Sequence, residues 1–464
     1  MGTKSFQVIS PGDGSIFLER PYADAGRIDQ SLSQAHDSFS DWKNRSVGER
    51  ARLCGAMVDW MVARKDQLAE EITRQMGRPI RYAAGEIGGF EERARYMIGI
   101  AETSLKPVCP PEKPGFTRYI ERVPLGVVFV VAPWNYPYLT SVNAIIPALM
   151  AGNPVILKHS SQTPLCAERL MEAAEAAGLP EGVFQYLHLN HGDAMKVAED
   201  DRVRHICFTG SVSGGVALEK GIAGKLKSIG LELGGKDPAY VRRDADLEQA
   251  VDTAIDGAFF NSGQSCCGIE RIYVDRNLYD EFVERAVGLV KLYRLGDPMD
   301  TETTLGPMVR TSAAEEVRKQ VSEAIESGAT SHIPESLFAM SRPGTPWLAP
   351  QILTGTTPDM RIMREETFGP SVTISPVDGD AEAIAAMNAS DFGLTAAIFT
   401  RDQEAGERIG RQLETGTVFV NRCDYLDPSL AWTGVKNSGK GCTLSGIGYE
   451  SLTRPKSYHL KSLD

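Results

Sequence analysis

Two adjacent cysteines, Cys266 and Cys267, are the residues of this chain best suited to nucleophilic chemistry. They end the segment NSGQSCC at residues 261–267, which follows an apolar helical pattern over residues 251–259. Gly263 gives this segment the freedom to aim one sulfur into a cleft. A thiolate is a strong nucleophile when neighbouring groups activate it, whereas a cysteine beside a glycine more often packs in a core. Cys266 is therefore the predicted nucleophile, provided that other segments supply its partners.

Three further segments carry polar groups that acyl chemistry on a thiol needs. Asn135 stands in APWNYP at residues 132–137, and its amide N–H can stabilise an oxyanion. Glu232 lies between apolar residues in LELGG, and a carboxylate in such surroundings is rare without a partner or a chemical task. Glu366 stands close to an aromatic residue in ETFGP. Taken alone, Asn135 is better explained as a turn residue and Glu366 as a surface acid, so only the set is informative.

The elements that must position these groups follow two patterns. Residues 27–104 have the periodicity of amphipathic helices, and Gly77 with Pro79 supplies a stop signal. From residue 123 the pattern changes to apolar strands that alternate with helices. Residues 126–132 and 154–158 are continuous apolar runs, as in strands buried on both faces of a parallel sheet. The chain therefore belongs to the α/β class.

A glycine-rich turn follows the strand predicted at residues 205–209. Residues 210–215 read GSVSGG and precede a helix, an order that presents backbone N–H groups to a phosphate. The turn departs from Gly-x-Gly-x-x-Gly, so by itself it is a weak dinucleotide signal. A second series of strands and helices begins near residue 270 and ends in a strand at residues 417–421.

The composition is that of an ordinary globular protein of 464 residues, 42% hydrophobic and 24% charged, which is long enough for two or three domains. The net charge of −12 does not favour binding to nucleic acid or to an anionic membrane surface, both of which attract positively charged proteins. The sequence contains no secretory signal and no apolar run that reads as a membrane span. The eight cysteines show neither a disulfide framework nor the spacing of a zinc site. We expect a cytoplasmic protein without a metal.

The ordered set of motifs resembles the aldehyde dehydrogenase superfamily across nearly the whole chain. The resemblance is carried by PWNYP at 133–137, GNPVILK at 152–158, FTGS at 208–211, LELGGK at 231–236, GQSC at 263–266, ETFGP at 366–370 and GVKNSG at 434–439. The resemblance implies a Rossmann-type NAD(P)-binding domain (residues 1–106 and 123–233), an α/β catalytic domain (234–440) and a β oligomerisation arm (107–122 and 441–464). Exposed strand patterns at 117–122 and 457–463 agree with such an arm, which implies a homodimer or homotetramer.

The resemblance also implies a mechanism. Cys266 attacks the aldehyde, Asn135 and the backbone N–H of Cys266 hold the oxyanion, hydride passes to the nicotinamide, and Glu232 activates the water that releases the carboxylic acid. Cys267 is then a neighbour of unassigned role, which oxidation would join to Cys266 only in a strained disulfide. The residues implied in binding NAD or NADP are Trp134, Lys158, Ser161, Gly210, Ser211, Gly215, Leu233, Glu366 and Phe368.

Two departures from the family pattern matter for the chemistry. Family members often carry a glutamate after Lys158 that binds the adenosine ribose, but here the run is KHSS and Ser161 stands at that place. Because a serine does not repel a 2′-phosphate, we expect use of both cofactors. Thr443 stands where many members have a glutamate that helps to relay protons, so any relay must follow another route.

The substrate is less defined by the sequence. The residues that the resemblance places along the aldehyde tunnel are Tyr136, Asn143, Arg422, Tyr425 and Trp432, a wall more polar than long aliphatic aldehydes require. Arg422 either binds a distal carboxylate, as in a semialdehyde substrate, or is a structural arginine; a small semialdehyde and an aromatic aldehyde both stay open. Two rival functions are a CoA-acylating semialdehyde dehydrogenase and a non-catalytic protein of the same fold. Glu232 argues against the first, and the intact set of catalytic groups argues against the second.

Overall fold

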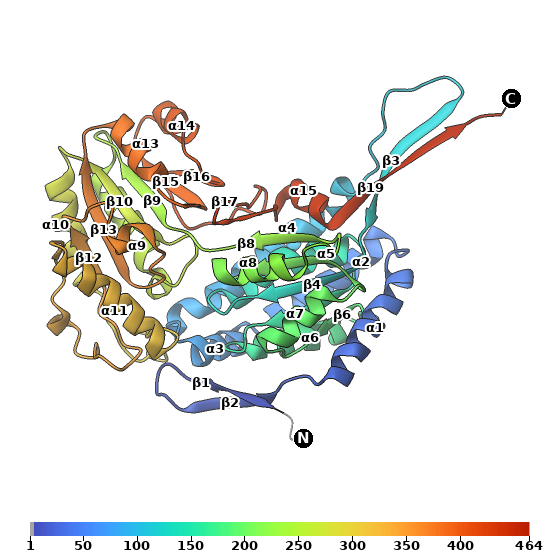
Figure 1. Cartoon of the computed structure of the whole chain (residues 1–464), viewed down its shortest axis with the longest axis horizontal. Helices are drawn as coiled ribbons and strands as arrows, with labels where there is room; N and C mark the ends of the chain where they lie inside the picture. Colours follow the sequence, from blue (N-terminus) through green and yellow to red (C-terminus); the bar gives the residue numbers. More distant parts are fainter. Residues whose placement is uncertain (1–3, 464) are drawn as a thin grey trace.

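The computed structural model describes residues 4–463, so residues 1–3 and 464 of the predicted domains lie outside the described part. Figure 1 shows two lobes side by side, each built around its own sheet, and a two-stranded ribbon that projects from one of them. A hairpin of β1 (Ser5–Ile9) and β2 (Ile16–Pro21) opens the chain. No helix among residues 4–463 is long and apolar enough to cross a membrane.

Four helices follow the hairpin, as the periodicity predicted. They are α1 (Ala25–Trp42), α2 (Val47–Val62), α3 (Lys65–Met76) and α4 (Ile80–Ser104). Ser46 and Glu49 form a capping box at the start of α2, and Gly77 ends α3 in the left-handed conformation. The apolar stripes of α2 to α4 pack into one large core, and α4 reaches the site described below.

The first sheet has six strands in the order β18-β8-β7-β4-β5-β6. They are β4 (Val127–Ala132), β5 (Val155–His159), β6 (Phe184–Tyr186), β7 (Val203–Thr209), β8 (Ser228–Glu232) and β18 (Gly439–Lys440). All residues of β4 and β5 are buried, which confirms the predicted parallel strands. The predicted catalytic segment 234–440 includes β18, yet β18 joins this first sheet, antiparallel to β8. The helices on this sheet are α5 (Pro137–Met150), α6 (Pro164–Ala176), α7 (His191–Glu199) and α8 (Val212–Gly221).

The second sheet has seven strands in the order β11-β12-β13-β10-β9-β15-β16. They are β9 (Asp237–Val241), β10 (Ile269–Asp275), β11 (Thr330–Ser331), β12 (Gln351–Thr354), β13 (Ser371–Val377), β15 (Thr395–Phe399) and β16 (Thr417–Val420). The main helices of this lobe are α9 (Leu247–Phe259), α10 (Tyr279–Val290), α11 (Thr311–Glu326), α13 (Asp380–Asn388) and α14 (Gln403–Gly410). Because β9 follows β8 after four residues, the site forms where the two lobes meet.

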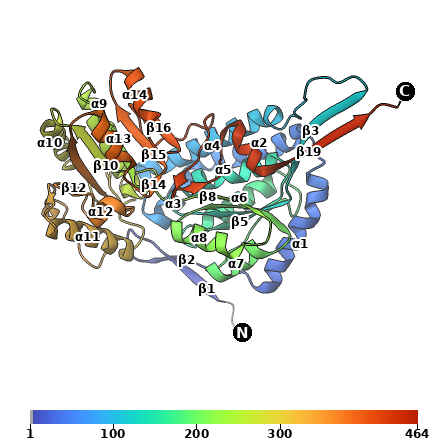
Figure 2. The ribbon, with the colours of Figure 1, turned by 45° about the horizontal axis from the view of Figure 1, so that its top comes forward.

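The projecting ribbon pairs β3 (Phe116–Pro124) with β19 (Thr453–Lys461) in antiparallel register. Figures 1 and 2 show it standing clear of both lobes. The rings of Tyr119 and Tyr458 stack across it with centroids 4.5 Å apart. The two exposed strand patterns of the sequence are therefore partners, although more than three hundred residues separate them.

Candidate active site

The loop that carries Cys266 is held in an unusual backbone conformation. After α9, Asn261, Ser262 and Gly263 all have positive φ, at 55°, 56° and 68°. A Cβ on Gly263 would lie 2.2 Å from the carbonyl oxygen of Gly369, so only glycine fits there. The Asn261 amide donates to the carbonyl of Gln264 at 3.2 Å. This turn leaves Cys266 partly exposed and Cys267 buried.

Asn135 lies against the same loop, between β4 and α5. The side-chain Nδ2 of Asn135 donates to the backbone carbonyl of Gln264 at 3.1 Å. The backbone carbonyl of Asn135 accepts a hydrogen bond from Arg78 Nη2 at 2.5 Å. Arg78 forms a buried ion pair with Glu86, and Glu86 accepts from the backbone of Tyr138 at 2.7 Å. A buried ion pair of α4 therefore fixes the segment that presents the Asn135 amide.

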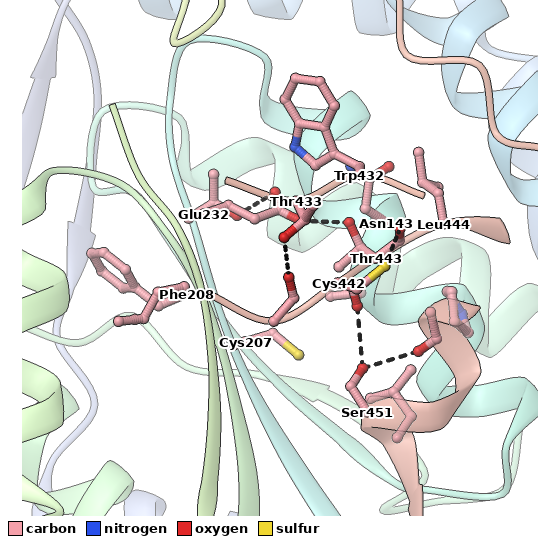
Figure 3. Close-up of a pocket in the computed structure, with 18 of the residues that line it drawn as sticks. Asn143, Cys207, Phe208, Glu232, Trp432, Thr433, Cys442, Thr443, Leu444 and Ser451 are labelled. Atoms are coloured by element: carbon pink, nitrogen blue, oxygen red, sulfur yellow. Dashed lines mark hydrogen bonds between the residues drawn. The ribbon is translucent and has the colours of Figure 1, made fainter. Parts of the chain in front are cut away.

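Glu232 stands at the end of β8 with two hydroxyl partners, as Figure 3 shows in part. Thr443 Oγ1 donates to its Oε1 at 2.6 Å, and Thr209 Oγ1 donates to its Oε2 at 3.2 Å. Burial raises the pKa of Glu232, while the two threonine donors act in the opposite direction. A carboxyl with a raised pKa that keeps donors for its charged form is suited to act as a general base near neutral pH.

Cys266, Cys267 and Glu232 line one chamber of about 380 Å³. Four of the five predicted tunnel residues also line it: Tyr136, Asn143, Tyr425 and Trp432. Arg422 does not; its side chain is exposed and its guanidinium lies 3.7 Å from the centroid of the Tyr425 ring. The chain turns outward there because Asn421 and Asp424, on either side, both have positive φ.

Five charged residues of the chamber were not predicted from the sequence: Arg78 and Glu86, which pair with each other, and Glu92, Arg93 and Asp424. One signal was available for Arg93, since it follows Phe90 by three residues and precedes Met97 by four, on the apolar stripe of α4. A charged residue on a buried face needs a partner or a function. Glu92 accepts from the Tyr425 hydroxyl at 2.5 Å, so it ties α4 to the chain that follows β16. Asp424 lies in an irregular segment for which no periodicity exists.

Cys267 has a clear contact of its own. Its Sγ donates to Asp424 Oδ1 at 2.9 Å. A hydrogen bond to Cys266, burial and the nearby Asp424 raise the pKa of the Cys267 thiol well above its ordinary value. Burial also raises the pKa of Asp424, to about 6. Cys267 is thereby held as a protonated donor, which separates it chemically from Cys266.

The predicted cofactor residues lie along the first sheet and its junction with the second lobe. Lys158 is the next-to-last residue of β5 and is 8% exposed. Within residues 4–463 its ammonium has no hydrogen-bond or ion-pair partner, and burial lowers its pKa to about 8. Ser211 caps α8 by accepting from the backbone of Gly214 at 3.2 Å. Ser161 is exposed. A buried cation without a partner and a helix N-terminus that follows a strand of the same sheet both fit the ribose or phosphate groups of a dinucleotide.

The other end of this region is aromatic and acidic. Trp134 and Phe368 pack edge to face with ring centroids 5.8 Å apart. Glu366 Oε1 accepts from the backbone of Gly235 at 3.0 Å, and burial raises the pKa of Glu366 to about 8. A Cβ on Gly210, in the turn before α8, would lie 2.7 Å from Phe208, and one on Gly215, in the first turns of α8, would lie 2.8 Å from Leu233. Neither position therefore has room for a larger side chain.

A parallel sheet with such a turn, next to a chamber that holds a thiol and a carboxylate, defines a dinucleotide-dependent oxidoreductase that acts through cysteine. A model of the aldehyde dehydrogenase family matches residues 1–458, and the chain belongs to this family. The protein is an NAD(P)-dependent aldehyde dehydrogenase, an enzyme that oxidises an aldehyde to an acid.

Relatives and solved structures agree over nearly the full chain. The succinate-semialdehyde dehydrogenase [NADP(+)] of Deinococcus radiodurans is 34% identical over 98% of this chain and 94% of its own. The succinate semialdehyde dehydrogenase [NAD(P)+] Sad of Escherichia coli is 33% identical over 95% of this chain and 94% of its own. The structure of an NAD-dependent aldehyde dehydrogenase from Sinorhizobium meliloti is 33% identical, with a TM-score of 0.94, and covers 99% of this chain and 92% of its own.

Proposed function

We propose that this enzyme is a hydrolytic semialdehyde dehydrogenase in which Cys266 is the nucleophile and Glu232 the base. The observation that carries this proposal is that Cys266 and Glu232 line the same chamber, although β9 and α9 separate them in the chain. The names of two relatives, both succinate-semialdehyde dehydrogenases, support the substrate class. The charged residue Arg93 on an otherwise largely apolar chamber wall supports it as well.

The first step is addition of the Cys266 thiolate to the aldehyde carbon, which moves the carbonyl electron pair onto oxygen. The Asn135 amide uses one N–H for the Gln264 carbonyl and keeps the second for this oxyanion. The backbone N–H of Cys266 is the second donor. Two donors held by a rigid loop stabilise the developing charge without reorganisation.

Bound NAD(P)+ would accept the hydride from the tetrahedral carbon, which leaves a thioester on Cys266. Lys158 and Ser211 would hold the adenosine ribose and the pyrophosphate. Glu366 would accept hydrogen bonds from the nicotinamide ribose, and the Trp134 and Phe368 rings would enclose the nicotinamide. The remaining predicted cofactor residues, Ser161, Gly210, Gly215 and Leu233, would form the adjoining surface.

Glu232 would then remove a proton from water as that water attacks the thioester, which releases the acid and restores Cys266. Its raised pKa makes it a stronger base than an exposed glutamate. This step distinguishes hydrolysis from transfer of the acyl group to CoA. The chamber supplies its own base for water, which favours hydrolysis.

The experiment that tests this proposal compares Cys266→Ser with Cys267→Ser on a semialdehyde substrate. Cys266→Ser is expected to lower kcat at least ~1000-fold, whereas Cys267→Ser keeps most of the activity because serine still donates to Asp424. Product analysis with and without CoA is expected to give the free acid in both cases. Full activity of Cys266→Ser, or acyl-CoA as the product, would refute the assignment.

We also propose a homodimer or homotetramer assembled through the β3–β19 ribbon, in the cytoplasm. A two-stranded ribbon is marginal in water without further packing, and Leu460 on it is 51% exposed. Light scattering of the full chain and of Leu460→Glu tests the assembly, with a smaller particle expected for the variant. An unchanged mass would count against this ribbon as the interface.

A further inference from the structure

Arg93 of α4 is a buried cation with an incomplete set of partners. Its side chain lines the catalytic chamber and is only 9% exposed. Its Nη1 donates to the carbonyl of Leu139 at 2.8 Å and to Oδ1 of Asn143 at 3.3 Å, both neutral groups. Within residues 4–463, its Nε and Nη2 have no acceptor, and neither atom is sealed from the chamber. Three N–H donors therefore remain available to a molecule in the chamber.

Three other buried cations within residues 4–463 have a fuller set of partners, whereas Lys158, which also lacks one, lies in the predicted cofactor region and does not line the chamber. Arg78 pairs with Glu86, and Lys236 pairs with Glu270. Arg271 has no carboxylate partner in the described part of the chain but donates to backbone carbonyls through Nε, Nη1 and Nη2. A buried charge is costly unless it is paired or fully hydrogen-bonded. Arg93 is the exception on the chamber wall, so the chamber contains a positive charge that no carboxylate of its wall neutralises through an ion pair.

The acidic groups that face Arg93 are committed elsewhere. Glu86 is paired with Arg78, Asp424 accepts from the Cys267 thiol, and Glu232 accepts from two threonine hydroxyls. Burial lowers the pKa of Arg93, while the charges of Cys267, Glu232, Glu86 and Asp424 partly oppose this effect. The guanidinium thus interacts electrostatically with these groups but forms no ion pair with any of them. A carboxylate brought in by the substrate would supply the missing partner.

We propose that Arg93 binds the distal carboxylate of the substrate, which assigns the chamber to short ω-oxo acids. The proposal rests on the proposed function, because it names the group that recognises a semialdehyde. Arg93 and Cys266 share one chamber of about 380 Å³, and Arg93 also contacts Asn143, a residue of the same wall. A carboxylate on Arg93 is therefore joined to the reacting aldehyde by a short spacer. Arg422, exposed and stacked on Tyr425, does not take this role.

The test compares kcat/KM for succinate semialdehyde and for butanal, which has the same chain length and no charge. The variant Arg93→Gln keeps a donor for the Leu139 carbonyl and removes the cation. The ratio of the two kcat/KM values is expected to fall roughly 30- to 100-fold, mainly through KM of the oxo acid. Arg93→Lys is expected to recover part of that ratio. The control Arg95→Gln, on the same helix but exposed and paired with Asp59 and Glu91, is expected to leave the ratio unchanged.

The outcomes separate the two proposals. A wild-type enzyme that prefers succinate semialdehyde, with a preference that survives in Arg93→Gln, would refute the anchor and leave the proposed function standing. An equal loss for both substrates would also refute it, since a merely structural arginine gives that result. A wild-type enzyme without preference for the oxo acid would refute the semialdehyde assignment and the anchor together. If Arg93→Gln does not fold, inhibition of wild-type butanal oxidation by succinate decides: competitive inhibition supports the anchor, and none overturns it.

Discussion

Thr443 Oγ1 donates a 2.6 Å hydrogen bond to Oε1 of Glu232 across 211 positions of sequence. The register of β18 with β8, in which Gly439 pairs with Glu232, brings the two residues together. A second cavity of about 30 Å³ lies behind Glu232, is lined by Thr443, Cys442 and Lys440, and shares Glu232 with the catalytic chamber. A hydroxyl thus stands beside the base at the place where the resemblance implies a carboxylate in many relatives.

Replacing Thr443 by valine is expected to slow deacylation and to change its pH dependence. The hydroxyl stabilises the ionised form of Glu232, so its loss raises the pKa of this carboxyl further. Because the base must be ionised, the acidic limb of the kcat profile moves to higher pH. We expect kcat at neutral pH to fall ~5-fold, the value of one hydrogen bond. Steady-state rates across pH 5–9 measure both effects.

Thr433→Val is the matched control for this experiment. Thr433 lines the same small cavity, but its Oγ1 donates to the carbonyl of Gly441 at 2.6 Å and not to Glu232. Its pH profile should overlay that of the wild type. A shift of equal size in both variants would mean that the cavity wall, and not the Thr443 hydrogen bond, controls the base.

Cofactor choice is expected to respond to charge at residue 161. Ser161 is exposed near the end of β5, and a glutamate there would repel a 2′-phosphate. We expect Ser161→Glu to lower kcat/KM for NADP at least ~10-fold, with little change for NAD. Ser161→Ala should keep both values within roughly 3-fold of the wild type. NADP turnover near zero in the wild type would contradict the expected use of both cofactors.

The use of NADP is also expected to depend on pH through Lys158. Burial lowers the pKa of this ammonium to about 8, so its positive charge is present below pH 8 and is lost as the pH rises above it. The charge attracts a 2′-phosphate more than a hydroxyl. KM for NADP should therefore rise above pH 8 more steeply than KM for NAD. Lys158→Met should flatten this difference, and parallel profiles in the wild type would remove Lys158 from phosphate recognition.

Removal of the Cys267 thiol is expected to destabilise the fold near neutral pH. In Cys267→Ala, the carboxylate of Asp424 loses its donor at 2.9 Å, a loss of about 1–3 kcal/mol for a buried acceptor. Cys267→Ser keeps a donor and should unfold close to the wild-type temperature. The pKa of Asp424 is about 6, so at pH 5 the carboxyl is protonated and the deficit of the alanine variant should shrink. Thermal unfolding at pH 7.5 and pH 5 measures this difference.

Much of the site followed from the sequence because its residues are set by local chemistry. The continuous apolar runs at residues 126–132 and 154–158 predict two buried strands, and the structure confirms them as β4 and β5. Gly263 is dictated by a left-handed turn pressed against Gly369. Such constraints act on neighbouring residues or on the backbone itself, so a single chain read in order reveals them. The order of seven motifs then implied the family, and the match of the aldehyde dehydrogenase family to residues 1–458 confirms it.

The tertiary structure alone decided the partners of the long and polar side chains. Arg93 enters the chamber because α4 packs beside α5, Asp424 reaches Cys267 because residues 421–424 turn through two positive-φ positions, and that turn also directs Arg422 to solvent. Thr443 meets Glu232 only because β18 returns to the first sheet. These contacts join segments far apart in the chain through irregular connections, where hydrophobic periodicity is absent. Sequence determined which groups we propose for the chemistry; folding decided which charges surround them.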